Sequence, residues 1–163
     1  NPAVKSSDDR KALWEALLDD RIDVIATDHA PHTLEEKQQV YTKAPSGGPL
    51  VQHALVAMFE AHLKEKISVE KIVEKMCHNP AKIFKIEKRG FIKVGFYADL
   101  VIVNPGLPWS VKKENILAKC GWSPFEGYTF KSRITHTFVN GELVYQNFKV
   151  KEIPVGKRLL FDR

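Results

Sequence analysis

The sequence predicts an α/β protein with a smaller, β-rich second part, and three observations support this. Residues 22–27 form a short, β-branched and nearly uncharged run, which suits a strand buried on both faces. Apolar residues at helical spacing flank this run on both sides. Near Gly90 the pattern changes from helical spacing to short β-rich runs separated by turn residues.

The composition excludes several classes of protein. The chain has 163 residues, of which 44% are hydrophobic and 28% charged, as in a globular protein with one core or two small ones. No apolar run approaches the roughly 20 residues that span a bilayer, and no export signal opens the chain. Cys77 and Cys120 form no CxxC pair, which favours a reducing compartment over a disulfide framework. We therefore expect a cytoplasmic protein that contacts no membrane.

The formal net charge of +5 does not predict nucleic-acid binding. Lys and Arg are spread among Asp and Glu along the chain and form no basic stripe. A mildly basic solvated surface, or attraction for a small anionic substrate, explains the charge more simply. The chain opens on Asn-Pro without a Met, so we expect it to be either processed or cut from a longer protein.

Helices dominate the predicted first half. Ser6 to Asp9 supply N-cap candidates for a helix that ends near Asp20 and leads into the strand at residue 22. Residues 33–48 are polar and form a long loop, a feature that is often functional in compact domains. Two helices follow, one from Pro49 to Lys64 and one capped by Ser68; residues 78–80 interrupt the second, and residues 81–84 add a further turn.

Short strands dominate the predicted second half. Asn140-Gly141 is the dipeptide typical of a tight hairpin. Residues 105–131 are irregular and rich in Pro, Trp and Gly. The β-rich runs are residues 91–94, 100–103, 134–139 and 143–145.

A compact polar cluster, Asp28, His29 and His32, comes directly after the predicted strand. Barrels and open sheets of the α/β class place reactive groups at such a strand end. An aspartate there can bind a metal ion and move a proton, although its more ordinary role is to form a turn or cap a helix. His32 is the favoured ligand-facing histidine, since it lies further from the strand. A direct His29–His32 zinc pair is less favoured, because zinc takes three or four ligands and no other donor has a defined spacing to them.

Gly47 and Gly48 also have two interpretations. They either allow a tight turn or bring backbone N–H groups close to an anionic or carbonyl ligand. The remaining histidines are expected at the surface or packed, and the aromatic residues of the second half are expected to pack rather than stack on bases.

The segment from Val24 to Lys37 resembles the eighth-strand segment of dihydroorotases of the longer bacterial class, within the metal-dependent cyclic amidohydrolases. The order Asp-His-Ala-Pro-His at residues 28–32 is more typical of dihydroorotases than of hydantoinases or allantoinases. Further similar stretches are residues 1–5, 79–81, 90–101, 123–127 and 139–141.

This resemblance implies the C-terminal part of a TIM-type (β/α)8 barrel in residues 1–86. Residues 87–163 are then a small, sandwich-like β module with a long irregular connection. A complete barrel needs about 250 residues, so we expect this chain to be a C-terminal piece of a dihydroorotase. A broken barrel leaves apolar faces uncovered, and we therefore expect self-association.

The resemblance also implies roles for four residues. Asp28 falls on the family's aspartate that ligates metal and shuttles a proton. His32 and Asn1 fall on residues that bind substrate, and Gly47 falls on a glycine whose backbone contacts substrate. Residues 46–52 depart from the family's pattern, which shifts the glycine assignment by a residue or so. The family's His-x-His motif, carboxylated lysine and two later histidines do not occur in this sequence.

The implied activity is the reversible, zinc-dependent hydrolysis of dihydroorotate to N-carbamoyl-aspartate in pyrimidine biosynthesis, with one or two zinc ions. Most zinc ligands would lie outside this chain, so we expect the chain alone to be inactive. Two alternatives remain open. One is a catalytically silent dihydroorotase-like subunit that supports aspartate transcarbamoylase, and the other is a cyclic amidohydrolase of the hydantoinase or allantoinase kind.

Overall fold

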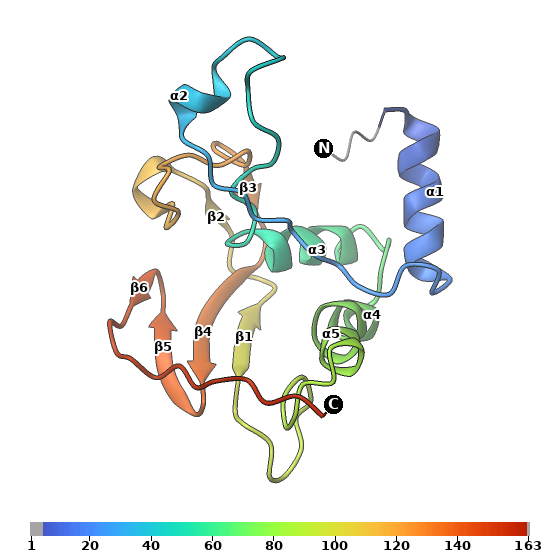
Figure 1. Ribbon diagram of the computed structural model, residues 1–163, viewed down its shortest axis with the longest axis vertical. Helices are drawn as coiled ribbons and strands as arrows, with labels where there is room; N and C mark the ends of the chain where they lie inside the picture. The colour runs from blue at the N-terminus through green and yellow to red at the C-terminus, as the bar shows by residue number, and fades with distance from the viewer. Residues whose placement is uncertain (1–4, 163) are drawn as a thin grey trace.

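The computed structural model describes residues 5–162, with helices in one half and small antiparallel sheets in the other (Figure 1). The helical elements are α1 (Ser7–Leu18), α2 (Leu34–Lys37), α3 (Ala54–His62), α4 (Val69–Val73), the π-helical turn η1 (Glu74–His78), α5 (Asn79–Ile83) and the 3-10 turn η2 (Lys113–Asn115). The strands are β1 (Leu100–Asn104), β2 (Trp109–Ser110), β3 (Thr129–Phe130), β4 (Arg133–Val139), β5 (Glu142–Gln146) and β6 (Lys149–Val150).

Helix α1 begins where the sequence predicts. The Ser6 hydroxyl accepts a hydrogen bond from the Asp9 backbone N–H at 3.1 Å, and the Asp9 carboxylate accepts one from the Ser6 N–H at 2.9 Å. This reciprocal pair satisfies two of the free N–H groups at the start of the helix. The helix ends at Leu18, slightly earlier than predicted, because Asp20 has a φ of 68° and leaves the helical conformation.

The predicted strand at residues 22–27 is wrong as regular secondary structure. The segment is held by helical partners: the Lys75 ammonium donates to the Ile22 carbonyl at 2.5 Å, and the Asn79 amide donates to the Asp23 carbonyl at 2.8 Å. Lys75 is 1% exposed and also pairs with Asp20 at 2.9 Å. A strand is defined by its hydrogen-bonded partner, and no strand within residues 5–162 pairs with this segment.

The second predicted helix runs on without the expected interruption at residues 78–80. Helices α4 and α5 are joined through the π-helical turn η1. A π-helical turn already alters the regular pattern of backbone hydrogen bonds. The missing N–H of Pro80, at the start of α5, therefore removes no regular α-helical hydrogen bond. Helix α3 begins at Ala54, whereas the sequence predicts a start at Pro49.

The larger sheet is antiparallel with strand order β1-β4-β5-β6. Its β4–β5 hairpin turns at Asn140 and Gly141, whose φ values of 52° and 87° confirm the predicted tight turn. The strands predicted at 100–103, 134–139 and 143–145 are confirmed. The strand predicted at 91–94 is wrong, because this segment is a turn region in which Ile92 and Val94 are 91% and 99% exposed.

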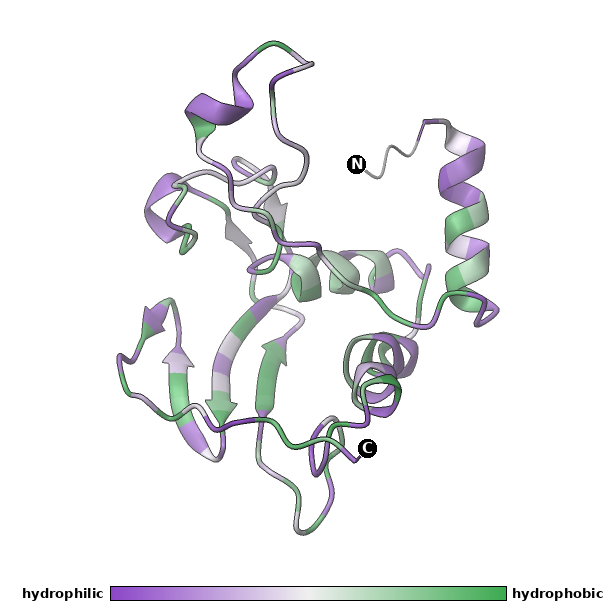
Figure 2. Ribbon diagram, in the orientation of Figure 1, coloured by the Kyte–Doolittle hydropathy of each residue, from purple (hydrophilic) through white to green (hydrophobic). Residues whose placement is uncertain are grey.

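Helix α3 connects the two apolar cores of the molecule. Its Ala61 packs in a helical cluster that contains Leu17 and Ile72, whereas its Val56 packs against Val111 and Phe130 of the second half. In Figure 2, most of the α3 ribbon has the colours of hydrophobic residues. Helix α3, which follows the polar cluster and the long loop, is therefore packed into both apolar cores.

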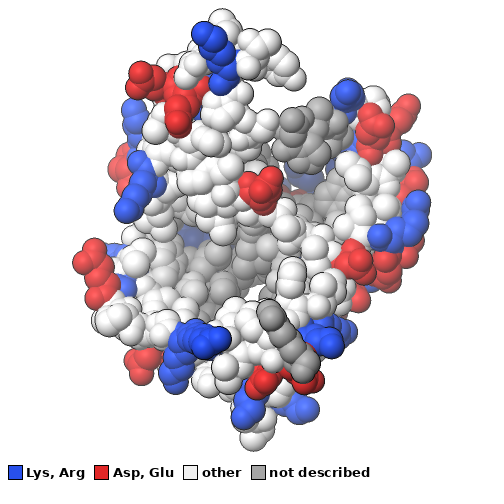
Figure 3. Space-filling model, viewed as in Figure 1, with Lys and Arg blue, Asp and Glu red and all other residues white. Residues whose placement is uncertain are grey.

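No helix within the described residues is long and apolar enough to cross a membrane. On the face shown in Figure 3, basic and acidic side chains are interspersed, and most of them lie toward its periphery. This distribution agrees with the absence of a basic stripe in the sequence.

Candidate functional site

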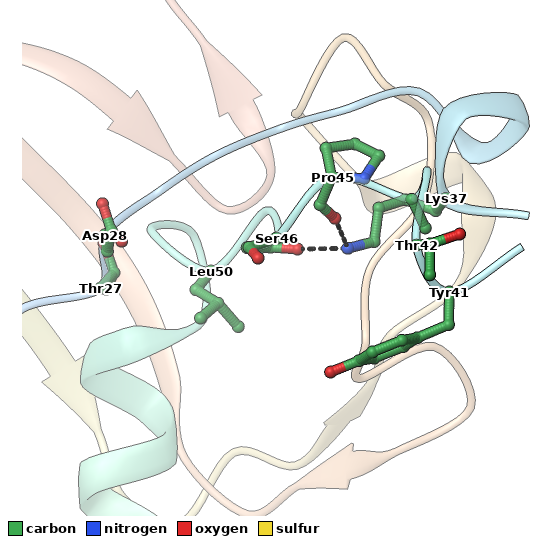
Figure 4. Close-up of a pocket in the computed structure, with 11 residues that line it drawn as sticks. Thr27, Asp28, Lys37, Tyr41, Thr42, Pro45, Ser46 and Leu50 are labelled. Atoms are coloured by element: carbon green, nitrogen blue, oxygen red, sulfur yellow. Dashed lines mark hydrogen bonds between the residues drawn. The ribbon is translucent and has the colours of Figure 1, made fainter. Parts of the chain in front are cut away.

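A cavity of about 680 Å³ lies between the end of the extended segment and the long polar loop (Figure 4). Its walls bring together two of the sequence-predicted site residues, Asp28 and Gly47. The other lining residues are Thr27, Lys37, Tyr41, Thr42, Ala44, Pro45, Ser46, Gly48 and Leu50.

Asp28 has an unusual backbone conformation. Its φ of 44° lies in the left-handed region, which Asp tolerates better than most residues. The residue is exposed, and its carboxylate has no hydrogen bond or ion pair with any other residue in the 5–162 range. An uncommitted carboxylate on a cavity wall is free to accept a proton or bind a cation.

His29 joins its segment to the loop at residues 48–51 and does not line the cavity. Its Nδ1 accepts a hydrogen bond from the Val51 N–H at 3.3 Å. The neighbouring Ala30 N–H donates to the Gly48 carbonyl at 3.2 Å, and His29 and Gly48 form an isolated parallel bridge. These contacts join the segment after Asp28 to the loop that carries both glycines.

Gly47 is required by its surroundings. Its φ is +92°, and a Cβ added there would lie 2.6 Å from the Ala30 Cβ. A larger residue would both strain the backbone and collide with Ala30. Gly47 therefore allows the loop to approach Ala30, two residues after Asp28.

His32 is not among the residues that line the cavity. Its ring Nδ1 lies 3.7 Å from the Glu36 carboxylate, and its backbone carbonyl accepts a hydrogen bond from the Trp122 indole at 2.8 Å. His32 thus lies four residues after Asp28, and its contacts are with Glu36 and Trp122, neither of which lines the cavity. Asn1 lies outside the described residues.

Sequence reasoning missed Lys37 and Tyr41, which line the cavity with Asp28. Lys37 is the last residue of α2 and directs its ammonium back across the loop (Figure 4). The available signal was the pair Thr33 and Glu36, which begins a short helix and so turns Lys37 toward the loop. A lysine near a helix end is otherwise typical of a solvated surface.

The described residues do not form a zinc site by themselves. Within 5–162, no group of three or more His, Cys, Asp and Glu side chains is placed to hold a metal ion. Asp28 would supply one ligand, whereas zinc takes three or four. The Asp28 carboxylate could be one ligand of a metal centre, but the described residues do not supply the others.

Comparison with known proteins decides the family. Residues 2–144 match the sequence model of the amidohydrolase family. This chain belongs to the amidohydrolase family. The predicted resemblance to dihydroorotases is also confirmed, because the chain is 38% identical over 159 residues to a dihydroorotase from Pyrococcus furiosus and 42% identical over 147 residues to one from Clostridioides difficile.

These amidohydrolase relatives are longer than this chain. The alignments cover 98% and 89% of the chain but only 37% and 34% of the two dihydroorotases, so the chain spans about a third of their length. An L-hydantoinase from Arthrobacter aurescens is similar in structure, with a TM-score of 0.85 and 30% identity over 92% of this chain and 34% of its own. A D-hydantoinase from a Thermus species, at 24% identity and a TM-score of 0.84 over 93% of this chain and 34% of its own, shares the fold.

Proposed function

We propose that this chain is the part of a dihydroorotase that carries its catalytic aspartate, Asp28. One observation supports this most strongly: the uncommitted Asp28 carboxylate shares a cavity with Gly47, in a chain 35–42% identical to dihydroorotases. The proposed reaction is the reversible hydrolysis of dihydroorotate to N-carbamoyl-aspartate in pyrimidine biosynthesis.

Asp28 has the properties that such a reaction needs. Ring opening requires a group that takes a proton from attacking water and delivers it to the leaving ring nitrogen. A carboxylate with no competing partner among the described residues can do both in turn. Gly47 would contact the substrate through its backbone, and His32 and Asn1 would contribute to substrate binding.

The cofactor of the complete protein would be zinc, one or two ions, with Asp28 as one ligand. A bound zinc ion lowers the pKa of water to near neutrality. Because the described residues supply one ligand of the three or four required, most ligands would lie outside this chain. We therefore propose that the chain alone is inactive.

The proposed fold is the last part of a TIM-type (β/α)8 barrel in residues 1–86 and a sandwich-like β module in residues 87–163. Two features support it: no strand within the described range pairs with the extended segment before Asp28, and an L-hydantoinase has a similar fold. Other strands would then pair with this segment in the complete protein. Exposed apolar residues such as Ile92 and Val94 support self-association of the chain alone.

The proposed partner is a small-molecule substrate in the cytoplasm, with no nucleic acid and no membrane. A silent subunit that supports aspartate transcarbamoylase is the first alternative, and it would lack turnover with every ring. A hydantoinase-type enzyme is the second, and the structural similarity to an L-hydantoinase favours it over other ring hydrolases.

The test is a turnover assay on the complete protein that carries this chain, loaded with zinc, with dihydroorotate and a hydantoin as parallel substrates. The proposal predicts hydrolysis of dihydroorotate and little of hydantoin. Preference for hydantoin, or no turnover of either ring, would contradict it. The chain alone, titrated with zinc, should bind no stoichiometric metal and show no activity.

A further inference from the structure

The Lys37 side chain connects the two ends of the loop that closes over the cavity. Lys37 ends α2, a short helix fixed by reciprocal hydrogen bonds between Thr33 and Glu36 at 2.7 and 3.2 Å. Residues 38–44 then leave the helix and return toward the cavity (Figure 1). The base of the Lys37 side chain is therefore fixed on the segment that follows Asp28.

The ammonium group of Lys37 donates two hydrogen bonds to this returning chain. They reach the Pro45 carbonyl at 2.6 Å and the Gly47 carbonyl at 2.9 Å. Both bonds involve a charged donor, which makes them stronger than bonds between neutral groups. No carboxylate within residues 5–162 forms an ion pair with Lys37, so the two carbonyl oxygens are its polar partners.

The two accepting carbonyls lie on either side of the Ser46–Gly47 peptide. Because each peptide is planar, fixing the two carbonyls also fixes the Ser46 and Gly48 N–H groups, so the Ser46–Gly47 peptide between them is held at both ends. Ala30 limits the other side of Gly47, since a Cβ at residue 47 would lie 2.6 Å from the Ala30 Cβ. Gly47 is thus held between Lys37 and Ala30, with its left-handed φ of +92°.

A glycine loop needs such a support. Glycine has the largest backbone freedom of any residue, and fixing it costs conformational entropy. A loop that is fixed before the ligand arrives does not incur this cost on binding. Lys43 lies on the same loop and is exposed, and its ammonium makes no such contact with residues 5–162, so the support is specific to Lys37.

We propose that Lys37 is a positioning residue that holds the Pro45–Gly48 segment in the conformation that presents Gly47 to the substrate. This inference rests on the proposed function for the role of Gly47. The clamp itself, two charged hydrogen bonds across the loop, is independent of which ring is hydrolysed.

Two measurements on the complete protein test the proposal, with Lys37→Met, which removes the donors at similar length, and Lys37→Arg, which retains them. Lys43→Met is the matched control. Hydrogen–deuterium exchange should be faster at the amides of residues 46–48 in Lys37→Met and unchanged in Lys43→Met. KM for dihydroorotate should rise about tenfold in Lys37→Met with a smaller change in kcat, and Lys37→Arg should recover part of it.

Unchanged hydrogen–deuterium exchange at residues 46–48 in Lys37→Met would show that the Lys37 hydrogen bonds do not hold the loop. Faster exchange with an unchanged KM would overturn the positioning role. If the complete protein hydrolyses neither dihydroorotate nor hydantoin, the proposed function is wrong, and so is the role of Lys37 in presenting Gly47 to the substrate. The exchange measurement still decides whether the two Lys37 hydrogen bonds hold the loop.

Discussion

The Trp122 indole N–H donates a hydrogen bond to the His32 carbonyl at 2.8 Å, across 90 residues of sequence. The same ring lies beside the glycine loop, since a Cβ added at Gly48 would be 3.8 Å from Trp122 Cη2. One side chain from the irregular stretch of the second half thus supports both segments that surround the cavity. The two halves of the chain cooperate in shaping this site.

Trp122→Phe should weaken the site more than the fold. The change removes one hydrogen bond, worth about 1 kcal/mol, and loosens the turn at His32. We expect a severalfold higher KM for dihydroorotate in the complete protein, on the scale of that energy. Trp14→Phe, in α1 and far from the cavity, is the control for loss of an indole. Equal KM values in the two variants would show that the Trp122 bond does not support the site.

Gly47→Ala should disrupt the loop through a collision as well as through backbone strain. Gly95 is the matched control, because its φ of +84° is similar but a Cβ there meets no atom within 4 Å. Gly95→Ala should lower the free energy of unfolding by about 1 kcal/mol from strain alone. Gly47→Ala should cost more and also raise KM. Chemical denaturation compares the two, and equal losses would mean that the Ala30 contact is relieved without cost.

The stability of the chain should fall in mild acid because of His53. This residue is 1% exposed, its ring stacks on Trp109 and Phe130, and its Nε2 has no hydrogen-bond partner among the described residues. Burial lowers the pKa of the imidazole below 6.5. His53 therefore binds a proton more readily in the unfolded chain than in the folded one. Its contribution to the free energy of unfolding is fully present above about pH 6.5 and is lost as the pH falls below that value.

The corresponding experiment measures the free energy of unfolding of the unsubstituted chain and of His53→Phe by chemical denaturation between about pH 7.5 and about pH 5.5. Phenylalanine suits the surrounding rings and does not titrate, so the variant should lose less stability over this range. Identical pH dependence in both chains would show that His53 is not the responsible group.

Local signals predicted much of the fold. The capping pair Ser6 and Asp9 and the turn at Asn140-Gly141 act within a few residues, so the sequence pattern alone located them. The strand expected at residues 22–27 failed because strand formation depends on a partner that local pattern does not reveal. The small β2–β3 sheet was missed for the same reason, since its strands are two residues long and far apart in sequence.

The site was predicted only in part. Asp28 and Gly47 were expected as site residues on family resemblance, and the structure brings both to one cavity. Their functional roles stay predictions. Lys37 was missed because a lysine at a helix end carries no sign of the carbonyl groups that its ammonium reaches. Long-range hydrogen bonds of this kind depend on loop conformation, which residue type and spacing do not define.

The most direct test of the account is the turnover of dihydroorotate by the complete, zinc-loaded protein with Asp28→Asn. Asparagine suits the left-handed φ of 44° and keeps the size of the side chain, but it does not carry a proton between water and the ring nitrogen. Asp23→Asn, an exposed carboxylate on the same segment, is the control. We predict that Asp28→Asn lowers kcat at least about a hundredfold with an unchanged unfolding transition, and that Asp23→Asn retains activity. Near-normal turnover in Asp28→Asn would contradict the central claim.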